Sequence, residues 1–267
     1  MVERLAESRH EIESVLVQEG RESLLPSHLP TSVPIFRLPK STIRSLAGFD
    51  FHRGILACGV RERRRSIDDL ITHVTALPPQ TIVPMASVRP VVLALMNVTC
   101  PENLGSLFRT AAALGIERVI IGPGTLDHLS RRVIRVSMGA AFHHHFYQFD
   151  DVASDLTRLR DEHDFEIIAT TLRDGAVPLD QWNPSRHDRP DHDRLDHDAY
   201  DRKSLDRERE YRPTVLMLGN EAAGLEPSIE NLATRRVTIP MHETADSLNV
   251  AVAGAIFMHE LTRRRDH

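Results

Sequence analysis

Three polar stretches of the chain combine residue types that can bind a ligand and handle charge. They read NVTCPENLGSLFRTAAALG (97–115), LGNEAAGLEPSI (218–229) and IPMHETADSLNVAVA (239–253). The first offers an amide and a guanidinium, the second a carboxylate beside glycine, and the third a hydroxyl and an amide where a helix begins. Free N–H groups at a helix start can hold a polar ligand together with short polar side chains. The candidate residues for chemistry are Asn103, Arg109, Glu221, Ser247 and Asn249.

Each of these side chains also has a plain structural interpretation. Asn103 is expected to cap the helix that carries Arg109, and Gly105 to let backbone approach a ligand. Alternatively, Asn103 and Ser247 are simple N-caps, Arg109 is a surface residue in a salt bridge, and Glu221 is an ordinary loop carboxylate. Arg109 lies among apolar neighbours, where a charge needs a partner. The occurrence of all these residues together, and in this order, favours a functional site.

Apolar runs alternate with helical patterns around the three polar stretches. The runs predict strands over 91–97, 118–122, 165–170, 214–219 and 236–241, and the patterns predict helices over 103–115, 151–163 and 247–265. Continuous apolar strands that alternate with helices are typical of an α/β fold with a mostly parallel sheet and helices on both faces. Ligands bind outside the carboxyl ends of the strands in such sheets, so the three polar stretches are expected to gather there.

The common nucleotide-binding and hydrolase motifs do not occur in the chain. GPGTLD (122–127) has Asp127 where a dinucleotide-binding fingerprint needs its third glycine, and no phosphate loop, HExxH or GxSxG pattern is present. The two cysteines, Cys58 and Cys100, fit neither a disulfide framework nor a zinc site. The histidine run at 143–145 is interpreted as a partly exposed strand rather than a ligand set, and no metal is expected.

Residues 183–212 interrupt the alternation of strands and helices. More than half of them are charged and almost none are aliphatic, so they are predicted to form a flexible insertion. His187, His192 and His197 recur among aspartates and raise the question of a metal site. A five-residue period does not place ligands on one helical face, so a solvated loop is favoured.

The charge balance does not at first suggest a nucleic-acid-binding protein. The chain has 33 basic and 38 acidic side chains, a formal charge of −5, whereas a strongly basic balance is the usual footprint of such proteins. Only the first 85 residues have a positive balance, and arginine clusters at 61–65 and 131–135 permit local basic patches. No apolar stretch approaches the ~20 residues that span a bilayer, and the charged N-terminus has no signal-peptide pattern, so a soluble cytoplasmic protein is expected.

The three polar stretches resemble, in order, the three motifs of the SpoU-type (TrmH-like) RNA 2′-O-ribose methyltransferases of the knotted SPOUT superfamily. The resemblance covers about residues 90–265 apart from the insertion. GFDFHRGILACGVR (48–61) resembles the segment that closes the family's small RNA-binding domain, which has a ribosomal-protein-like fold. The resemblance therefore implies an RNA substrate-binding domain over 1–85, without its usual opening strand, and a methyltransferase domain over 86–267.

The resemblance also implies a cofactor and a set of site residues. The family binds S-adenosylmethionine in a deep trefoil knot formed by its last two motifs, a rare exception to the rule that chains do not thread themselves. The five candidate residues named above occupy the family's functional polar positions. The implied cofactor contacts are Leu218, Gly219, Ile239, Met241 and Leu248.

The role of the arginine and the identity of the substrate stay open at this point. The family's arginine is proposed to act as a base with help from an RNA phosphate, but Arg109 equally suits a role in positioning the phosphate and stabilising the alkoxide. The resemblance implies a homodimer and an RNA substrate, with ribosomal RNA slightly favoured over transfer RNA. The alternatives are a base methyltransferase of the same superfamily and a non-catalytic RNA-binding protein.

Overall fold

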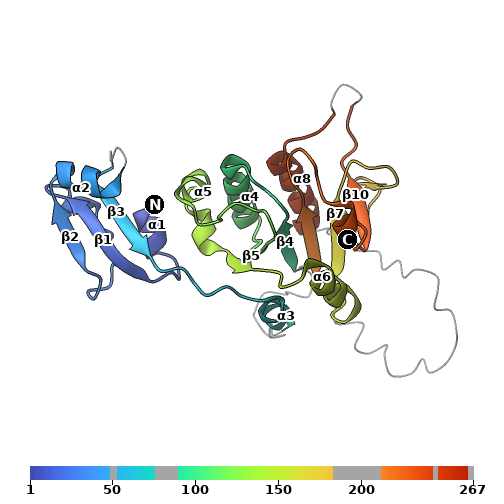
Figure 1. Cartoon of the computed structure of the whole chain (residues 1–267), viewed down its shortest axis with the longest axis horizontal. Helices are drawn as coiled ribbons and strands as arrows, with labels where there is room; N and C mark the ends of the chain where they lie inside the picture. Colours follow the sequence, from blue (N-terminus) through green and yellow to red (C-terminus); the bar gives the residue numbers. More distant parts are fainter. Residues whose placement is uncertain (49–52, 76–89, 183–211, 243–245, 264–267) are drawn as a thin grey trace.

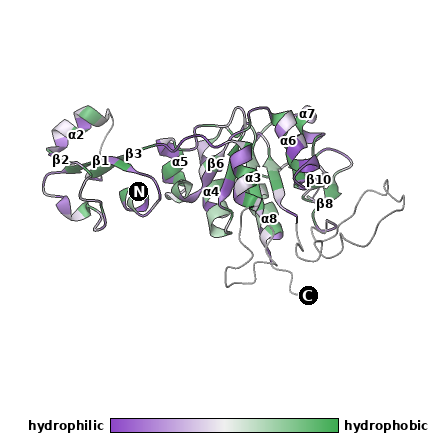
Figure 2. Cartoon of the chain, turned by 90° about the horizontal axis from the view of Figure 1, so that it is seen from below, coloured by the Kyte–Doolittle hydropathy of each residue, from purple (hydrophilic) through white to green (hydrophobic). Residues whose placement is uncertain are grey.

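The computed structural model describes residues 1–48, 53–75, 90–182, 212–242 and 246–263 of the chain. The described residues form a small sheet at one end of the molecule and a larger sheet with helices beside it (Figure 1). Figure 2 shows the same separation from below. The insertion predicted over 183–212 lies outside the described residues except for Arg212. No described helix is both long and apolar enough to cross a membrane.

Seven strands form the larger sheet in the order β6-β5-β4-β9-β7-β10-β8, and neighbouring strands pair in parallel throughout. The apolar runs correspond to β4, β5, β7, β9 and β10, so the predicted mostly parallel α/β sheet is confirmed. The central strand β9 separates β4 from β7, although it follows both in the chain. The strands are β4 (Val91–Leu95), β5 (Arg118–Ile121), β6 (His145–Tyr147), β7 (Glu166–Thr170), β8 (Val177–Pro178), β9 (Thr214–Leu218) and β10 (Arg235–Thr238).

Helices cover both faces of this sheet, which explains why its strands are apolar on both sides. Leu93 and Leu95 point into one core, which α4 (Pro101–Ala113), α5 (Arg131–Val136) and α8 (Val250–Thr262) complete. Val92 and Ala94 point into the other core, beneath α3 (Ile67–Thr75), α6 (Val152–Asp161) and α7 (Pro227–Glu230). The carboxyl edge of the sheet is left for the loops.

The small sheet at the start of the chain has the order β2-β1-β3. Its strands are β1 (Ile12–Gln18), β2 (Ile35–Leu38) and β3 (Ile55–Gly59), with β2 parallel and β3 antiparallel to β1. The helices α1 (Val2–Ala6) and α2 (Lys40–Ala47) belong to the same segment. Leu5, Ile12 and Val15 pack with Phe142 of the 3-10 helix η3 (Ala140–His143), so the small sheet is joined to the larger part through an apolar contact.

The helix α3 follows the small sheet but packs on the larger one. Ile67, Leu70 and Val74 are buried in the core that contains Tyr147 of β6. The His73 Nδ1 atom also lies 2.8 Å from the hydroxyl oxygen of Tyr147. The domain boundary expected near residue 85 therefore lies after a helix that packs with the second domain.

Two helices begin at residues other than those expected. Pro101 takes the first position of α4, where its missing N–H costs nothing, so the helix starts before Asn103. Asn103 is consequently a buried residue of the first turn and not the cap. The helix α8 is capped by Asn249, whose Oδ1 accepts a hydrogen bond from the Ala251 N–H at 2.9 Å. Ser247 is exposed and precedes the cap.

The histidine run at 143–145 forms a strand only in part. His143 ends η3, and His145 begins β6. His144 between them is 1% exposed, and its Nε2 donates to the carbonyl oxygen of Phe108 at 2.9 Å. This histidine is therefore a core residue whose Nε2 is held by a backbone carbonyl.

Candidate functional site

A tight loop at the carboxyl end of β9 forms the centre of the site. Asn220 and Gly224 pair through two backbone hydrogen bonds of 3.0 Å, and the Asn220 side chain accepts from two N–H groups inside the loop. A Cβ atom at Gly219 would lie 2.3 Å from the carbonyl carbon of Gly224. Only glycine fits at position 219, so the expected cofactor contact is also the residue that allows the loop to close on itself.

The Glu221 carboxylate joins all three polar stretches predicted from the sequence. Its Oε1 accepts from Asn103 Nδ2 and from the Cys100 N–H, both at 3.1 Å. Asn249 Nδ2 in turn donates to Asn103 Oδ1 at 2.9 Å. The prediction that the stretches gather at the carboxyl edge of the sheet is thereby confirmed for these residues, which lie 118 and 146 positions apart in the chain.

The donors around Glu221 decide its charge state. Burial of this carboxyl disfavours ionisation, but hydrogen bonds from Asn103 and from the backbone N–H groups of Cys100 and Thr99 outweigh burial and lower its pKa. Glu221 is therefore ionised at neutral pH. Because all of these donors are neutral, the negative charge itself is not cancelled.

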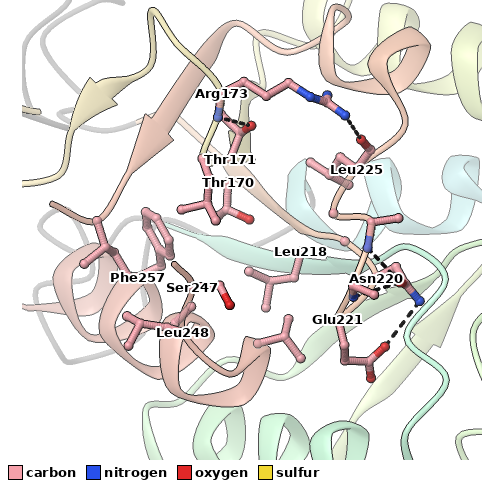
Figure 3. Close-up of a pocket in the computed structure, with 18 of the residues that line it drawn as sticks. Thr170, Thr171, Arg173, Leu218, Asn220, Glu221, Leu225, Ser247, Leu248 and Phe257 are labelled. Atoms are coloured by element: carbon pink, nitrogen blue, oxygen red, sulfur yellow. Dashed lines mark hydrogen bonds between the residues drawn. The ribbon is translucent and has the colours of Figure 1, made fainter. Parts of the chain in front are cut away.

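A pocket of about 240 Å³ opens beside this cluster, at the carboxyl ends of β7, β9 and β10 and the start of α8. Figure 3 shows Leu248 and Ser247 on one side of Leu218 and Glu221 on the other, and all four residues line the pocket. Among the polar candidates, Glu221 and Ser247 line the pocket, whereas Asn103, Arg109 and Asn249 do not. All five expected cofactor contacts line it: Leu218, Gly219, Ile239, Met241 and Leu248.

The sequence did not reveal the wall that follows β7. Thr170, Thr171 and Arg173 line the pocket from this side. Arg173 Nη2 donates to the Leu225 carbonyl oxygen at 3.0 Å (Figure 3). Its Nη1 pairs with the Glu230 carboxylate, which is 2% exposed. The available signal was the position of these residues just after an apolar strand, but it could be used only once β7 was known to lie between β9 and β10.

Gly105 has a different purpose from the one expected. A Cβ atom there would lie 2.6 Å from the Cβ of Val136 on α5. The glycine therefore lets α4 and α5 approach each other and does not expose backbone to a ligand.

Arg109 stands apart from the hydrogen-bonded cluster. It lies on α4, is exposed, and forms no hydrogen bond or ion pair with any other residue in the described part of the chain. The alternative that Arg109 is a surface residue in a salt bridge finds no support among the described residues, because no acidic partner is within reach of the exposed side chain there. An exposed guanidinium without a partner is free to bind an anion from outside the protein.

The two arginine clusters are partly neutralised by acidic partners. Arg61 forms a bidentate pair with Asp127, at 2.9 and 2.6 Å, and Arg132 pairs with Glu102 beside α4. The basic patches expected from the sequence therefore offer fewer free cations than their arginine count suggests. Within the described ranges, a single group of side chains is spaced for a metal ion, and it is exposed and outside the pocket: Glu3, Glu7 and His28.

Residues 90–259 of the chain match the family model described as the SpoU rRNA Methylase family. An uncharacterised tRNA/rRNA methyltransferase of Mycobacterium tuberculosis is 29% identical over the whole chain and 80% of its own length. The 23S rRNA (guanosine-2′-O-)-methyltransferase RlmB of Acinetobacter baylyi is 25% identical, over 88% of this chain and 81% of its own. The structure of an AdoMet-bound rRNA methyltransferase from Sinorhizobium meliloti superposes with a TM-score of 0.70 at 22% identity, over 97% of this chain and 83% of that one.

Proposed function

The chain belongs to the SpoU rRNA methylase family, and we propose that it transfers a methyl group from S-adenosylmethionine to a ribose 2′-hydroxyl of ribosomal or transfer RNA. The observation that carries the proposal is the junction of the three motifs. Asn103, Glu221 and Asn249 form one hydrogen-bonded cluster next to a pocket that all five expected cofactor contacts line.

The residues of the pocket fit S-adenosylmethionine chemically. Leu218, Leu248 and Phe257 supply apolar surface for an aromatic ring system, and the loop 219–225 supplies backbone groups for hydrogen bonds. The bound donor supplies a methyl group on a positively charged sulfur. The uncancelled negative charge of Glu221 at the rim of the pocket favours a cation there.

Glu221 and the two asparagines act as positioning residues in this proposal. The carboxylate already accepts hydrogen bonds on both oxygens, and its lowered pKa keeps it from holding a proton at neutral pH. It therefore fixes the relative position of the loop 219–225, the first turn of α4 and the start of α8. Asn249 contributes twice, as the cap of α8 and as a donor to Asn103.

Arg109 is assigned to the RNA. A guanidinium has five N–H donors and no acceptor, so it is suited to bind an anion and is a poor base. It does match the geometry of a phosphate, and a fixed positive charge stabilises a 2′-oxygen as that oxygen loses its proton. The freedom of Arg109 from protein partners among the described residues supports this role.

The assignment of Arg109 is tested by methyl transfer to RNA from cells that lack the gene. Arg109→Ala is expected to lower the rate by ~10²-fold or more while the affinity for S-adenosylmethionine stays unchanged in calorimetry. Arg160→Ala is the matched control, because Arg160 lies on α6 on the other face of the sheet and is expected to leave the rate unchanged. A wild-type rate for Arg109→Ala would remove its proposed role.

The position of the methyl group separates the proposal from a base methyltransferase of the same superfamily. A 2′-O-methyl group blocks alkaline cleavage of the neighbouring phosphodiester linkage, and a methylated base does not. A product that alkali still cleaves at the modified nucleotide would favour the base methyltransferase.

The preference for ribosomal RNA over transfer RNA is supported by the similarity to relatives named for 23S rRNA and by the small N-terminal sheet.

A homodimer is part of the proposal, and an apolar stripe on α8 supports it. Val252 and Ile256 lie one turn apart on α8 and are 49% and 38% exposed, and Leu248, which precedes the helix, is 36% exposed. Such a stripe is buried when two copies meet about a twofold axis. Ile256→Glu is expected to convert the dimer to monomers in sedimentation experiments, and a monomeric wild type would contradict the arrangement.

The trefoil knot and the ribosomal-protein-like N-terminal domain are further parts of the proposal. The chain leaves β9 in the centre of the sheet, forms β10 two strands away, and returns to α8, which packs against both β9 and α4. Gly254 supports a tight return, because a Cβ atom there would lie 2.5 Å from a methyl carbon of Leu107. A crystal structure that traces the chain from β9 to α8 tests the knot.

A further inference from the structure

Next to the pocket wall that follows β7, one buried carboxylate lies between two arginines. Glu230, the last residue of α7, is 2% exposed, so water does little to screen its charge. Its Oε2 atom pairs with Arg173 Nη1, and its Oε1 atom lies 3.7 Å from Arg236 Nη1. A buried carboxylate without a partner is strongly destabilising, so Glu230 needs these two cations. The three residues form the Glu230 cluster.

The Glu230 cluster joins three segments that build the pocket. Arg173 follows β7, Glu230 ends α7, and Arg236 belongs to β10. Arg173 itself lines the pocket, and so do the loop 219–225, which precedes α7, and Ile239, which follows β10. The charges are therefore placed where they hold the walls of the pocket in position relative to one another.

Arg173 is the member of the cluster that reaches the loop 219–225. While its Nη1 is paired with Glu230, its Nη2 donates to the carbonyl oxygen of Leu225 at 3.0 Å (Figure 3). Leu225 is the last residue of the loop, and its side chain is 2% exposed in the core beneath α7. Because the side chain and the carbonyl group of Leu225 are both held, the peptide group that ends the loop has a fixed orientation.

A guanidinium suits these two contacts better than any other cation of a protein. Its donors lie in one plane and point in different directions, whereas the ammonium group of lysine is a compact point charge. The Arg173 side chain is 43% exposed, but its orientation is set by a carboxylate that is shielded from water. Arg173 therefore preorganises the loop, so less ordering is needed when a ligand binds.

The loop 219–225 is thus anchored from two sides. Glu221, near its start, accepts hydrogen bonds from Asn103 Nδ2 and from the Cys100 N–H, on the side of α4. Leu225, at its end, is anchored by Arg173 on the side of β7. The first anchor lies among the residues assigned to methyl transfer, and the second lies apart from them.

We infer that Arg173 is a positioning residue for the methyl donor, which holds the loop 219–225 in the shape that binds the adenosine part of S-adenosylmethionine. The inference rests on the proposed function, in which the backbone groups of this loop form hydrogen bonds to the donor. Arg173 acts through the carbonyl group of Leu225 and not on the reacting atoms. Its loss is therefore expected to weaken donor binding far more than it lowers the rate at saturation.

Calorimetric titration of the full-length protein with S-adenosylhomocysteine and with 5′-methylthioadenosine tests the inference. Arg173→Lys keeps a positive charge for Glu230, but one nitrogen cannot occupy both the Nη1 and the Nη2 positions. The variant is expected to bind both ligands ~tenfold more weakly, as the loss of one charge-assisted hydrogen bond predicts. In methyl transfer, the KM for S-adenosylmethionine is expected to rise by a similar factor, while the KM for RNA stays unchanged.

Arg235→Lys is the matched control. Arg235 precedes Arg236 on β10 and pairs at 3.2 Å with Glu166, a buried carboxylate at the other end of β7 from Arg173. Neither Arg235 nor Glu166 lines the pocket. This variant changes an arginine that is paired in the same way, and it is expected to keep the wild-type affinity for both ligands.

A second variant serves if Arg173→Lys does not fold. Arg173→Met combined with Glu230→Gln removes the buried charge together with its partner, so no carboxylate is left unpaired. This double variant also lacks the donor to Leu225, and it is expected to bind S-adenosylhomocysteine as weakly as Arg173→Lys. Denaturant unfolding of each variant measures its stability separately from its affinity.

The outcomes separate the inference from its alternatives. Wild-type affinity for both ligands in these variants, with or without a loss of stability, would overturn it, because Arg173 would then serve the fold alone. A loss confined to S-adenosylhomocysteine would also overturn it, because 5′-methylthioadenosine lacks the amino-acid part, which Arg173 would then bind directly. Neither result touches the methyl-transfer reaction. A wild-type protein that binds neither ligand would instead overturn the proposed function, and the inference with it.

Discussion

Two glutamates of this protein sit at the centre of polar clusters that differ in one respect, the charge of the donors. Glu221 in the site accepts from asparagine amides and backbone N–H groups. Glu62, where the small sheet meets the larger part, accepts from Arg9 Nε at 2.7 Å and Arg65 Nη2 at 3.0 Å. Both carboxyls are partly buried, and both pKa values are lowered.

The charge of the donors gives the clusters around Glu62 and Glu221 different uses. The two guanidinium groups cancel the charge of Glu62, and Arg9 also donates to the carbonyl oxygens of His143 and His144, so this cluster joins two parts of the chain. The neutral donors of Glu221 hold its geometry equally well but leave its charge to act on whatever enters the pocket. The same side chain therefore serves packing in one place and, in our proposal, electrostatics in the other.

The largest expected effect is on the rate of methyl transfer when either glutamate is replaced by glutamine. Glu221→Gln removes the charge and turns an N–H₂ group toward the donors that surround it, so methyl transfer is expected to fall by ~10²-fold. Glu62→Gln is the matched variant, and it is expected to change the rate little while lowering stability. Rates measured at saturating RNA and S-adenosylmethionine compare the two. Equal rate losses in both variants would mean that the charge of Glu221 has no special role.

The next prediction concerns how the free energy of unfolding depends on pH through two histidines near the contact between the small sheet and the larger part. Burial lowers the pKa of His145 to about 4, with added effects of Arg9, Arg65 and Arg118, and burial likewise lowers that of His128 to about 4. The unfolded chain binds these protons near pH 6.5, so the folded state loses stability as the pH falls from 6.5 toward 4. The loss is expected to be on the order of 2 kcal/mol in all, after allowance for partial exposure.

Denaturant unfolding between pH 7.5 and pH 5 measures this loss of stability. His145→Asn is expected to flatten the dependence of the free energy of unfolding on pH, because the titrating ring is gone. His28→Asn, at an exposed position of the small N-terminal part, is the control. A slope that is unchanged in His145→Asn would place the acid sensitivity elsewhere.

The smallest expected effect belongs to the Arg61–Asp127 pair, which also links the two parts. The pair is bidentate, but its side chains are 58% and 45% exposed, so solvent screens the attraction. A double-mutant cycle with Arg61→Ala and Asp127→Ala is expected to give a coupling energy below about 1 kcal/mol. A larger value would mean that this pair, and not the cluster around Glu62, holds the two parts together.

The sequence predicts the sheet well because both of its faces are buried. A strand such as β4, with all five residues 6% exposed or less, must be a continuous apolar run, and such a run is easy to find. The polar stretches were also visible, because each follows an apolar run. The start of α4 was misplaced because Asn103 resembles a cap, whereas Pro101 sets the first turn.

Other features depend on contacts that no local pattern records. Arg173 lines the pocket because β7 lies beside β9. The residues of the two strands do not predict that the strands are neighbours. The cluster around Glu62 joins Arg9 to the carbonyl oxygen of His144, 135 residues further along the chain.

The central position of β9 has a consequence for the nascent chain during its synthesis on the ribosome. The strands β4 and β7 do not touch each other and are joined only through β9, which is made last of the three. Until residue 218 has emerged, the edges of β4 and β7 that later pair with β9 are unsatisfied and can pair with other chains. At ~5–20 residues per second, the interval between the synthesis of β7 and β9 lasts seconds. The strand from which the candidate site's central loop leaves is therefore also the one that covers these two edges.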